Sequence, residues 1–137
     1  MFTDYIKDMG TNEDNYNVTI LIAEDEESNF LLLKTILKRH CNVLQARIGL
    51  ELLKVFAEKG ADLILLDIKM PEMNGIEALK EIRKKDTNIP IIMQSAYAFE
   101  NDMEAARAAG SNGFITKPIN IVELKKTISK FLPQIIW

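Results

Sequence analysis

Short apolar runs alternate with amphipathic segments along most of this chain. Five runs of four to six mostly apolar residues are bounded by turn residues, which is typical of strands buried on both faces of a sheet. Between them, and after the last, apolar residues recur at helical spacing. The predicted strands are 18–23, 42–46, 63–67, 90–94 and 113–116. The first predicted helix begins near Ser28 or Asn29, the next three cover 49–59, 76–85 and 100–109, and the last begins at residue 121.

Alternating strands and helices predict an α/β fold, a doubly wound five-stranded parallel sheet with helices on both faces. The weakly apolar strand 42–46 is expected near an edge. Residues 1–17 are rich in Asp, Asn, Thr and Gly, so we interpret them as a flexible leader or linker. Residues 18–132 then form one domain, and residues 133–137 form a C-terminal tail.

Two helices carry further local signals. Asn120 and Glu123 have the spacing of a capping box, which predicts the start of the last helix. The helix 100–109 has Met103 as its only large hydrophobic residue, and alanines fill most of the rest. Alanine favours a helix but buries little area, so this helix either packs loosely and can shift its position or obeys a plain small-residue packing constraint.

Composition restricts the setting in which the protein works. The chain has 137 residues, a net charge of −3 and no basic block, so direct binding of nucleic acid is not expected. No apolar run approaches the roughly 18 residues of a membrane span, so no membrane insertion is expected. Cys41 is the only cysteine, which excludes an internal disulfide and fits a reducing, cytoplasmic compartment. His40 is the only histidine, which argues against a histidine-based metal cluster.

Polar residues gather at the ends of the predicted strands. Glu24 and Asp25 follow the first strand, Asp67 ends the third, Ser95 follows the fourth and Lys117 follows the fifth. Taken alone, Asp67 is equally well explained as the cap of a turn. Parallel strands, however, bring all these side chains to one edge of the sheet, where ligands bind in such folds.

Carboxylates that lie this close repel one another, so the site favours a cation. Oxygen ligands indicate Mg²⁺ rather than zinc. Lys117 offers a positive charge to an anion, and Ser95 offers a hydroxyl donor. A nucleophilic carboxylate with these neighbours suits the formation of an acyl phosphate.

The chain strongly resembles the receiver domain of two-component response regulators over about residues 18–132. The residues that carry the resemblance are Glu24-Asp25, Asp67 with Met70, Pro71 and Gly75, Ser95-Ala96, and Phe114 three residues before Lys117-Pro118. The resemblance implies a flavodoxin-like sheet of order 2-1-3-4-5. It also implies a phosphoacceptor in two-component signalling that is not an enzyme, although slow self-dephosphorylation is possible.

Residue roles follow from the resemblance alone. It implies that Asp67 accepts a phosphoryl group from a partner phosphohistidine, while Ser95 and Lys117 hold the phosphoryl oxygens. Mg²⁺ would be bound by Asp25, by Asp67, by the backbone carbonyl of Lys69, and by Glu24 through water. Ser95 and Phe114 would act as switch residues, and Lys69 and Tyr97 would flank the site. A cis bond is implied between Lys117 and Pro118.

The implied partners are a histidine kinase or a histidine phosphotransfer domain, and a downstream output protein or domain. Two residues depart from the family pattern. Glu24 stands where Asp is more usual, which lengthens its reach. Phe114 stands where Tyr is common and has no hydroxyl to bond once it swings inward. A stand-alone regulator and a module of a hybrid histidine kinase remain equally compatible with the sequence.

Three other classes of function fit the sequence less well. A flavodoxin-like cofactor binder needs a phosphate-cradling loop after the first strand, but residues 24–27 are all acidic. Absorbance at flavin wavelengths separates this class. An aspartate-dependent phosphatase usually has a second Asp two residues after the nucleophile, where this chain has Lys69. A degenerate receiver that binds partners without phosphorylation conflicts with the intact set of site residues.

Overall fold

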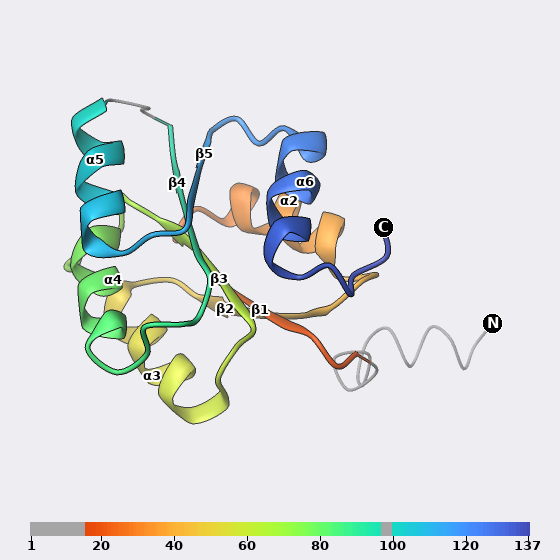
Figure 1. Ribbon diagram of the computed structural model, residues 1–137, viewed down its shortest axis with the longest axis horizontal. Coiled ribbons are helices and arrows are strands. Elements are labelled where there is room, and N and C mark those ends of the chain that lie inside the picture. The colour runs from red at the N-terminus through yellow and green to blue at the C-terminus, as the bar shows by residue number, and fades with distance from the viewer. Residues whose placement is uncertain (1–15, 97–99) are drawn as a thin grey trace.

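The computed structural model describes residues 16–96 and 100–137. Predictions for Tyr97 and for nearly all of the leader, residues 1–17, lie outside these residues. The strands form one parallel sheet of order β2-β1-β3-β4-β5, so the predicted fold class and strand order are confirmed (Figure 1). The strands are β1 (Thr19–Ala23), β2 (Asn42–Ala46), β3 (Leu63–Asp67), β4 (Ile91–Ser95) and β5 (Gly113–Thr116).

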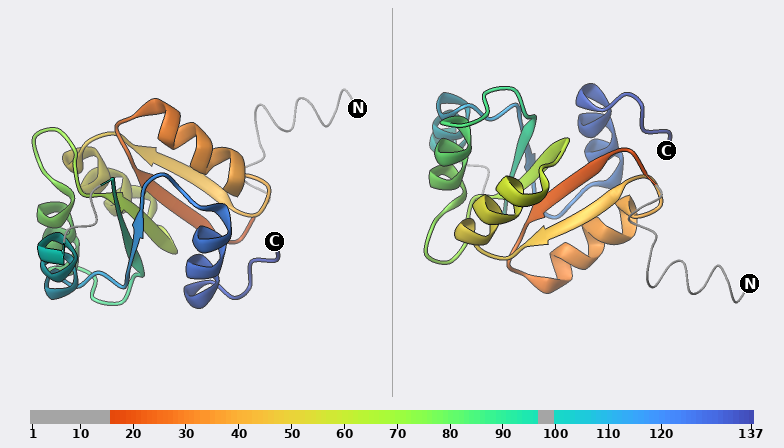
Figure 2. Two further views of the ribbon diagram at one scale, coloured as in Figure 1. Left: turned by 90° about the horizontal axis from the view of Figure 1, so that it is seen from above. Right: turned by 90° about the horizontal axis from the view of Figure 1, so that it is seen from below.

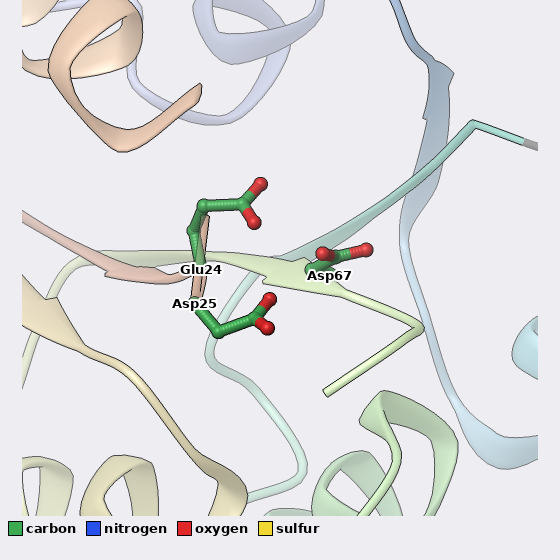
Figure 3. Close-up of side chains that lie close together, drawn as sticks. All are labelled: Glu24, Asp25 and Asp67. Carbon is green, nitrogen blue, oxygen red and sulfur yellow. The ribbon is translucent and has the colours of Figure 1, made fainter. Parts of the chain in front are cut away.

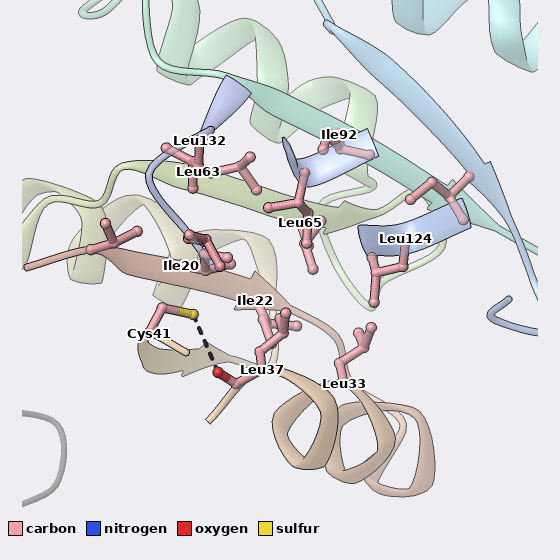
Figure 4. Close-up of a cluster of buried hydrophobic side chains, with 14 of the residues drawn as sticks. Ile20, Ile22, Leu33, Leu37, Cys41, Leu63, Leu65, Ile92, Leu124 and Leu132 are labelled. Carbon is pink, nitrogen blue, oxygen red and sulfur yellow. Dashed lines mark hydrogen bonds between the residues drawn. The ribbon is translucent and has the colours of Figure 1, made fainter. Parts of the chain in front are cut away.

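Helices cover both faces of the sheet, as Figure 2 shows from two sides. The helices are α2 (Glu27–Leu37), α3 (Gly49–Lys59), α4 (Gly75–Arg83), α5 (Glu100–Ala109) and α6 (Ile121–Phe131). Apolar residues of α2 and α6 share one core cluster with one face of the sheet (Figure 4). Apolar residues of α3, α4 and α5 share a second cluster with the other face.

Successive side chains of a strand point to opposite faces of the sheet, so alternate residues of each strand belong to different core clusters. Ile20 and Ile22 of β1, Leu63 and Leu65 of β3, and Ile92 of β4 pack beneath α2 and α6. Their neighbours in each strand pack beneath the other three helices. The central strand β3 is buried along its whole length, as the run of four apolar residues before Asp67 predicts.

Several boundaries differ from the prediction. The expectation that Ser28 or Asn29 starts α2 was wrong, because the helix begins at Glu27 after Glu26, which makes no side-chain cap. Helix α4 begins at Gly75 because Asn74 and Glu77 form a reciprocal capping box. Strand β4 begins one residue later than predicted and ends on Ser95.

The start of α6 agrees with the prediction in part. Asn120 caps the helix by accepting a hydrogen bond from the Glu123 N–H at 3.0 Å. Ile121, expected on the apolar face, is the first residue of the helix and has an exposed fraction of 46%. Leu32 of α2, expected beside the apolar face of that helix, is also exposed.

Residues 133–137, expected to form a tail, pack against the domain. Ile135 is buried in the α2/α6 cluster. The Trp137 Nε1–H donates to Ser129 Oγ at 2.7 Å, and the Trp137 ring meets the His40 ring edge-on at 5.0 Å. This segment therefore ties the end of α6 to the turn after α2. Among the described residues, no helix is long and apolar enough to cross a membrane.

Candidate functional site

The polar residues predicted at the strand ends do come together. Asp25, Asp67, Ser95 and Lys117 all line one cavity of about 380 Å³ at the carboxyl edge of the sheet, together with Glu26, Lys69 and Ala96. Glu24 lies beneath this cavity and is fully buried. Ser95 is buried as well, with an exposed fraction of 2%.

Three carboxyl groups converge at this edge (Figure 3). Glu24, Asp25 and Asp67 each place one carboxylate oxygen within 4.8 Å of the other two. Asp67 is buried and Asp25 is exposed, so the cluster joins the interior of the protein to the open cavity. Oxygen donors in this arrangement fit a hard cation such as Mg²⁺ rather than a softer metal.

Lys117 supplies the positive charge of the site. Its Nζ lies 2.7 Å from Glu24 Oε1 and 3.0 Å from Asp67 Oδ2. Burial on its own lowers the pKa of Lys117, but its hydrogen bonds to Glu24 and Asp67 and the charges of the two carboxylates outweigh burial, so the pKa of Lys117 is raised. Lys117 is therefore held as an ammonium ion between two buried acids.

Glu24 has the most perturbed carboxyl group of the site. Burial raises the pKa of Glu24 from 4.5 to about 7, and the nearby charge of Asp67 adds to this increase. The contact with Lys117 and a hydrogen bond that Glu24 Oε2 accepts from the Glu26 N–H at 3.1 Å act in the opposite direction. Glu24 Oε1 pairs with Lys117 Nζ, and as a carboxylate oxygen it can also accept a hydrogen bond from a bound water.

The loop after β3 holds Asp67 in place. The Gly75 N–H donates to the Ile68 carbonyl at 2.7 Å, and the Lys69 N–H donates to Asp67 Oδ1 at 3.3 Å. A Cβ atom at Gly75 would overlap the Asp67 carbonyl oxygen and lie 2.9 Å from Ile68 Cα. Only glycine therefore lets the start of α4 approach the end of β3 this closely.

Phe114 lies apart from the cavity that holds Asp67. It packs with the second core cluster and lines a separate cavity of about 160 Å³ with Met103 and Arg107 of α5. The peptide bond between Lys117 and Pro118 is cis, in agreement with the resemblance.

Sequence reasoning missed two residues of this edge. Glu26 lines the cavity and accepts a hydrogen bond from Ser28 Oγ at 2.9 Å, but its place in an acidic run gave it no individual signal. Gln94 belongs with Glu24, Asp67 and Ser95 to the buried polar residues of the described chain. A signal existed in the sequence, because Gln94 is a polar residue at the end of an otherwise apolar run.

A family model described as the response regulator receiver domain matches residues 20–129. The chain therefore belongs to the response regulator receiver domain family. It is 34% identical over 117 residues to the polar-differentiation response regulator DivK of Brucella anthropi, a match that covers 83% of this chain and 95% of that protein.

Solved structures agree with this family. The chemotaxis protein CheY4 of Vibrio cholerae is 27% identical with a TM-score of 0.80, over 84% of this chain and 98% of that one. The receiver domain of the sensor histidine kinase PA1611 of Pseudomonas aeruginosa is 26% identical with a TM-score of 0.79, over 86% and 99%. In that structure a magnesium ion is coordinated in the active site cleft.

Proposed function

We propose that this protein accepts a phosphoryl group on Asp67 and thereby acts as a switch in two-component signalling. The observation that carries the proposal is the contact of Lys117 with both Glu24 and Asp67 at the floor of one open cavity. Family membership gives the class of protein, and this geometry supports the choice of Asp67 as the acceptor among the carboxylates of the chain.

Asp67 is the best nucleophile of the three acids by position. Its carboxylate lines the cavity and is held by the Lys69 N–H and by Lys117 Nζ. In the transfer, the bond between phosphorus and the partner's histidine nitrogen breaks as an Asp67 oxygen bonds to phosphorus, and the histidine is left neutral. Lys117 and Ser95, which line the same cavity, would hold the phosphoryl oxygens.

Mg²⁺ is the cofactor that fits the donor set. Asp25, Asp67 and the backbone carbonyl of Lys69 would hold it directly, and Glu24 would hold it through water. The ion supplies positive charge opposite the phosphoryl oxygens when it is bound. The receiver domain of PA1611, which coordinates magnesium, supports this assignment by likeness.

The proposed partners are a histidine kinase or a histidine phosphotransfer domain on the donor side and an output protein or domain on the other. Both phosphoryl transfer and the proposed output take place in the cytoplasm. Ser95 and Phe114 are the proposed switch residues, because Ser95 lines the acceptor cavity and Phe114 of β5 lines a second cavity together with residues of α5. The protein itself acts as an acceptor and not as an enzyme, apart from slow self-dephosphorylation.

Intact-mass spectrometry with acetyl phosphate tests the proposal. We expect wild type to gain one phosphoryl group in the presence of Mg²⁺ and none in EDTA. The variant Asp67→Asn should gain none, and the variant Asp102→Asn, altered on α5 away from the cavity, should behave as wild type. Equal labelling of wild type and Asp67→Asn would contradict the assignment of the acceptor.

A further inference from the structure

Strand β4 carries a buried amide that the proposed mechanism leaves without a role. The side chain of Gln94 has an exposed fraction of 2%, and its Nε2 has no hydrogen-bond partner among the described residues. A buried donor without an acceptor costs folding free energy, whereas an apolar side chain of similar shape would avoid that cost. The amide is therefore available as a donor to a neighbouring group in another state of the protein.

The register of the sheet places Gln94 beside the acceptor. Ile92 packs beneath α2 and α6 while Met93 packs on the other face, so Gln94 points to the α2/α6 face. In β3, Leu65 packs on the α2/α6 face and Leu66 on the other face, so Asp67 also points to the α2/α6 face. Asp67 and Gln94 are direct partners in the parallel register of β3 and β4.

Neighbouring strands lie about 4.8 Å apart, so the amide of a glutamine reaches the side chain of its partner on the next strand. The backbone reinforces the link, because the Gln94 carbonyl accepts a hydrogen bond from the Ile68 N–H at 3.0 Å. Glu24 directly follows β1, whose last residue Ala23 pairs with Leu66, the residue before Asp67, so Glu24, Asp67 and Gln94 lie at the ends of three neighbouring strands. Gln94 adds a donor to these strand ends without adding a charge.

We propose that Gln94 is a further donor of the phosphoacceptor site, whose Nε2–H group donates a hydrogen bond to an oxygen of Asp67 once Asp67 is phosphorylated. The proposal rests on the proposed function of Asp67. The unphosphorylated protein bears the cost of the unpaired amide, and the phosphorylated protein recovers the bond. Gln94 thus favours the phosphorylated state over the unphosphorylated one.

The chain provides a matched control in Gln45 of β2. Its Nε2 is also buried and unpaired, but Gln45 is the register partner of Ile22 and lies two strands away from β3. Methionine resembles glutamine in length and volume and has no N–H group. The changes Gln94→Met and Gln45→Met therefore remove the same kind of donor near the acceptor and far from it.

The experiment compares wild type, Gln94→Met and Gln45→Met in acetyl phosphate and Mg²⁺. Intact mass gives the ratio of phosphorylated to unphosphorylated protein at steady state, and urea melts give the stability of the unphosphorylated forms. We expect Gln94→Met to lower the phosphorylation ratio by up to about tenfold, the upper end of the effect of one neutral hydrogen bond, and to increase unphosphorylated stability. Gln45→Met should leave the ratio unchanged. If Gln94→Met does not fold, Gln94→Leu makes the same test.

Two results would overturn the inference while leaving the proposed function intact. In the first, wild type is phosphorylated and Gln94→Met matches it. In the second, both methionine variants lose phosphorylation equally, which would indicate a general effect of packing. If wild type itself gains no phosphoryl group on Asp67, the proposed function fails first.

Discussion

Replacing Glu24 with glutamine should stabilise the metal-free protein, and increasingly so as the pH rises. Glutamine keeps the shape of the side chain and can still accept a hydrogen bond from Lys117, which retains its own contact with Asp67. The folded protein holds the Glu24 proton more tightly than the unfolded chain does, because burial raises the Glu24 pKa from 4.5 to about 7. The stability that Glu24 contributes is thus complete below pH 4.5 and is lost as the pH rises to 7 and above.

The pKa of Glu24 also sets the size of the effect. Each pKa unit corresponds to about 1.4 kcal/mol, so a change from 4.5 to about 7 sets an upper limit of about 3 kcal/mol. We expect roughly half of this limit, since local relaxation and penetration of water offset part of the cost of burial. Glu24→Gln should therefore match wild type near pH 5 and exceed it by about 1 to 2 kcal/mol at pH 8.

Urea melts in EDTA at pH 5, 6, 7 and 8 measure this difference. The exposed residue Glu58 of α3 offers a control, because Glu58→Gln should give a difference that does not change with pH. Saturating Mg²⁺ should shrink the advantage of Glu24→Gln, since the wild-type carboxylate then has a cation nearby. A difference that is constant from pH 5 to pH 8 would refute the reasoning about burial.

Three further comparisons test other parts of the site. In EDTA, Asp67→Asn should stabilise the protein more than Asp25→Asn, because Asp67 is buried and Asp25 is exposed. In urea melts, Mg²⁺ should increase the stability of both variants by less than it increases the stability of wild type. Lys117→Ala should cost about 3 kcal/mol in EDTA at pH 8, because it leaves two buried carboxylates unpaired, yet calorimetry should still detect Mg²⁺ binding. Gly75→Ala should lower folding stability by at least about 2 kcal/mol and slow the labelling of Asp67, because the new Cβ meets backbone atoms. Gly113→Ala is the control and should lower stability less, because its Cβ has no neighbour closer than 3.5 Å.

The sequence predicts the fold well because its signals are strong and local. Four apolar residues before Asp67 mark a buried strand, and the helix 49–59 begins and ends where its pattern and Gly60 indicate. Polar residues at the ends of parallel strands must share one edge, so the convergence of Asp67, Ser95 and Lys117 follows from topology. The capping box of Asn74 and Glu77 was equally visible in the sequence, but the loop signals around Pro71 obscured it.

Other features depend on the tertiary structure. The contact of Lys117 with both acids, and the resulting pKa of Glu24, depend on burial that no local pattern encodes. The role of Gln94 depends on register, since only the pairing of β3 with β4 places it beside Asp67. Trp137 lies eight residues from Ser129 in sequence, and its contacts with Ser129 and His40 required the full path of the chain.

The most direct test of the central claim is to locate the phosphoryl group chemically. Wild type is treated with acetyl phosphate and Mg²⁺ and then with borohydride, which reduces the acyl phosphate of an aspartate to homoserine, and the peptides are sequenced by mass spectrometry. We expect homoserine at position 67 in wild type and at no acidic position in Asp67→Asn. Homoserine at position 25 or 62, or its absence from a phosphorylated wild-type sample, would contradict the account.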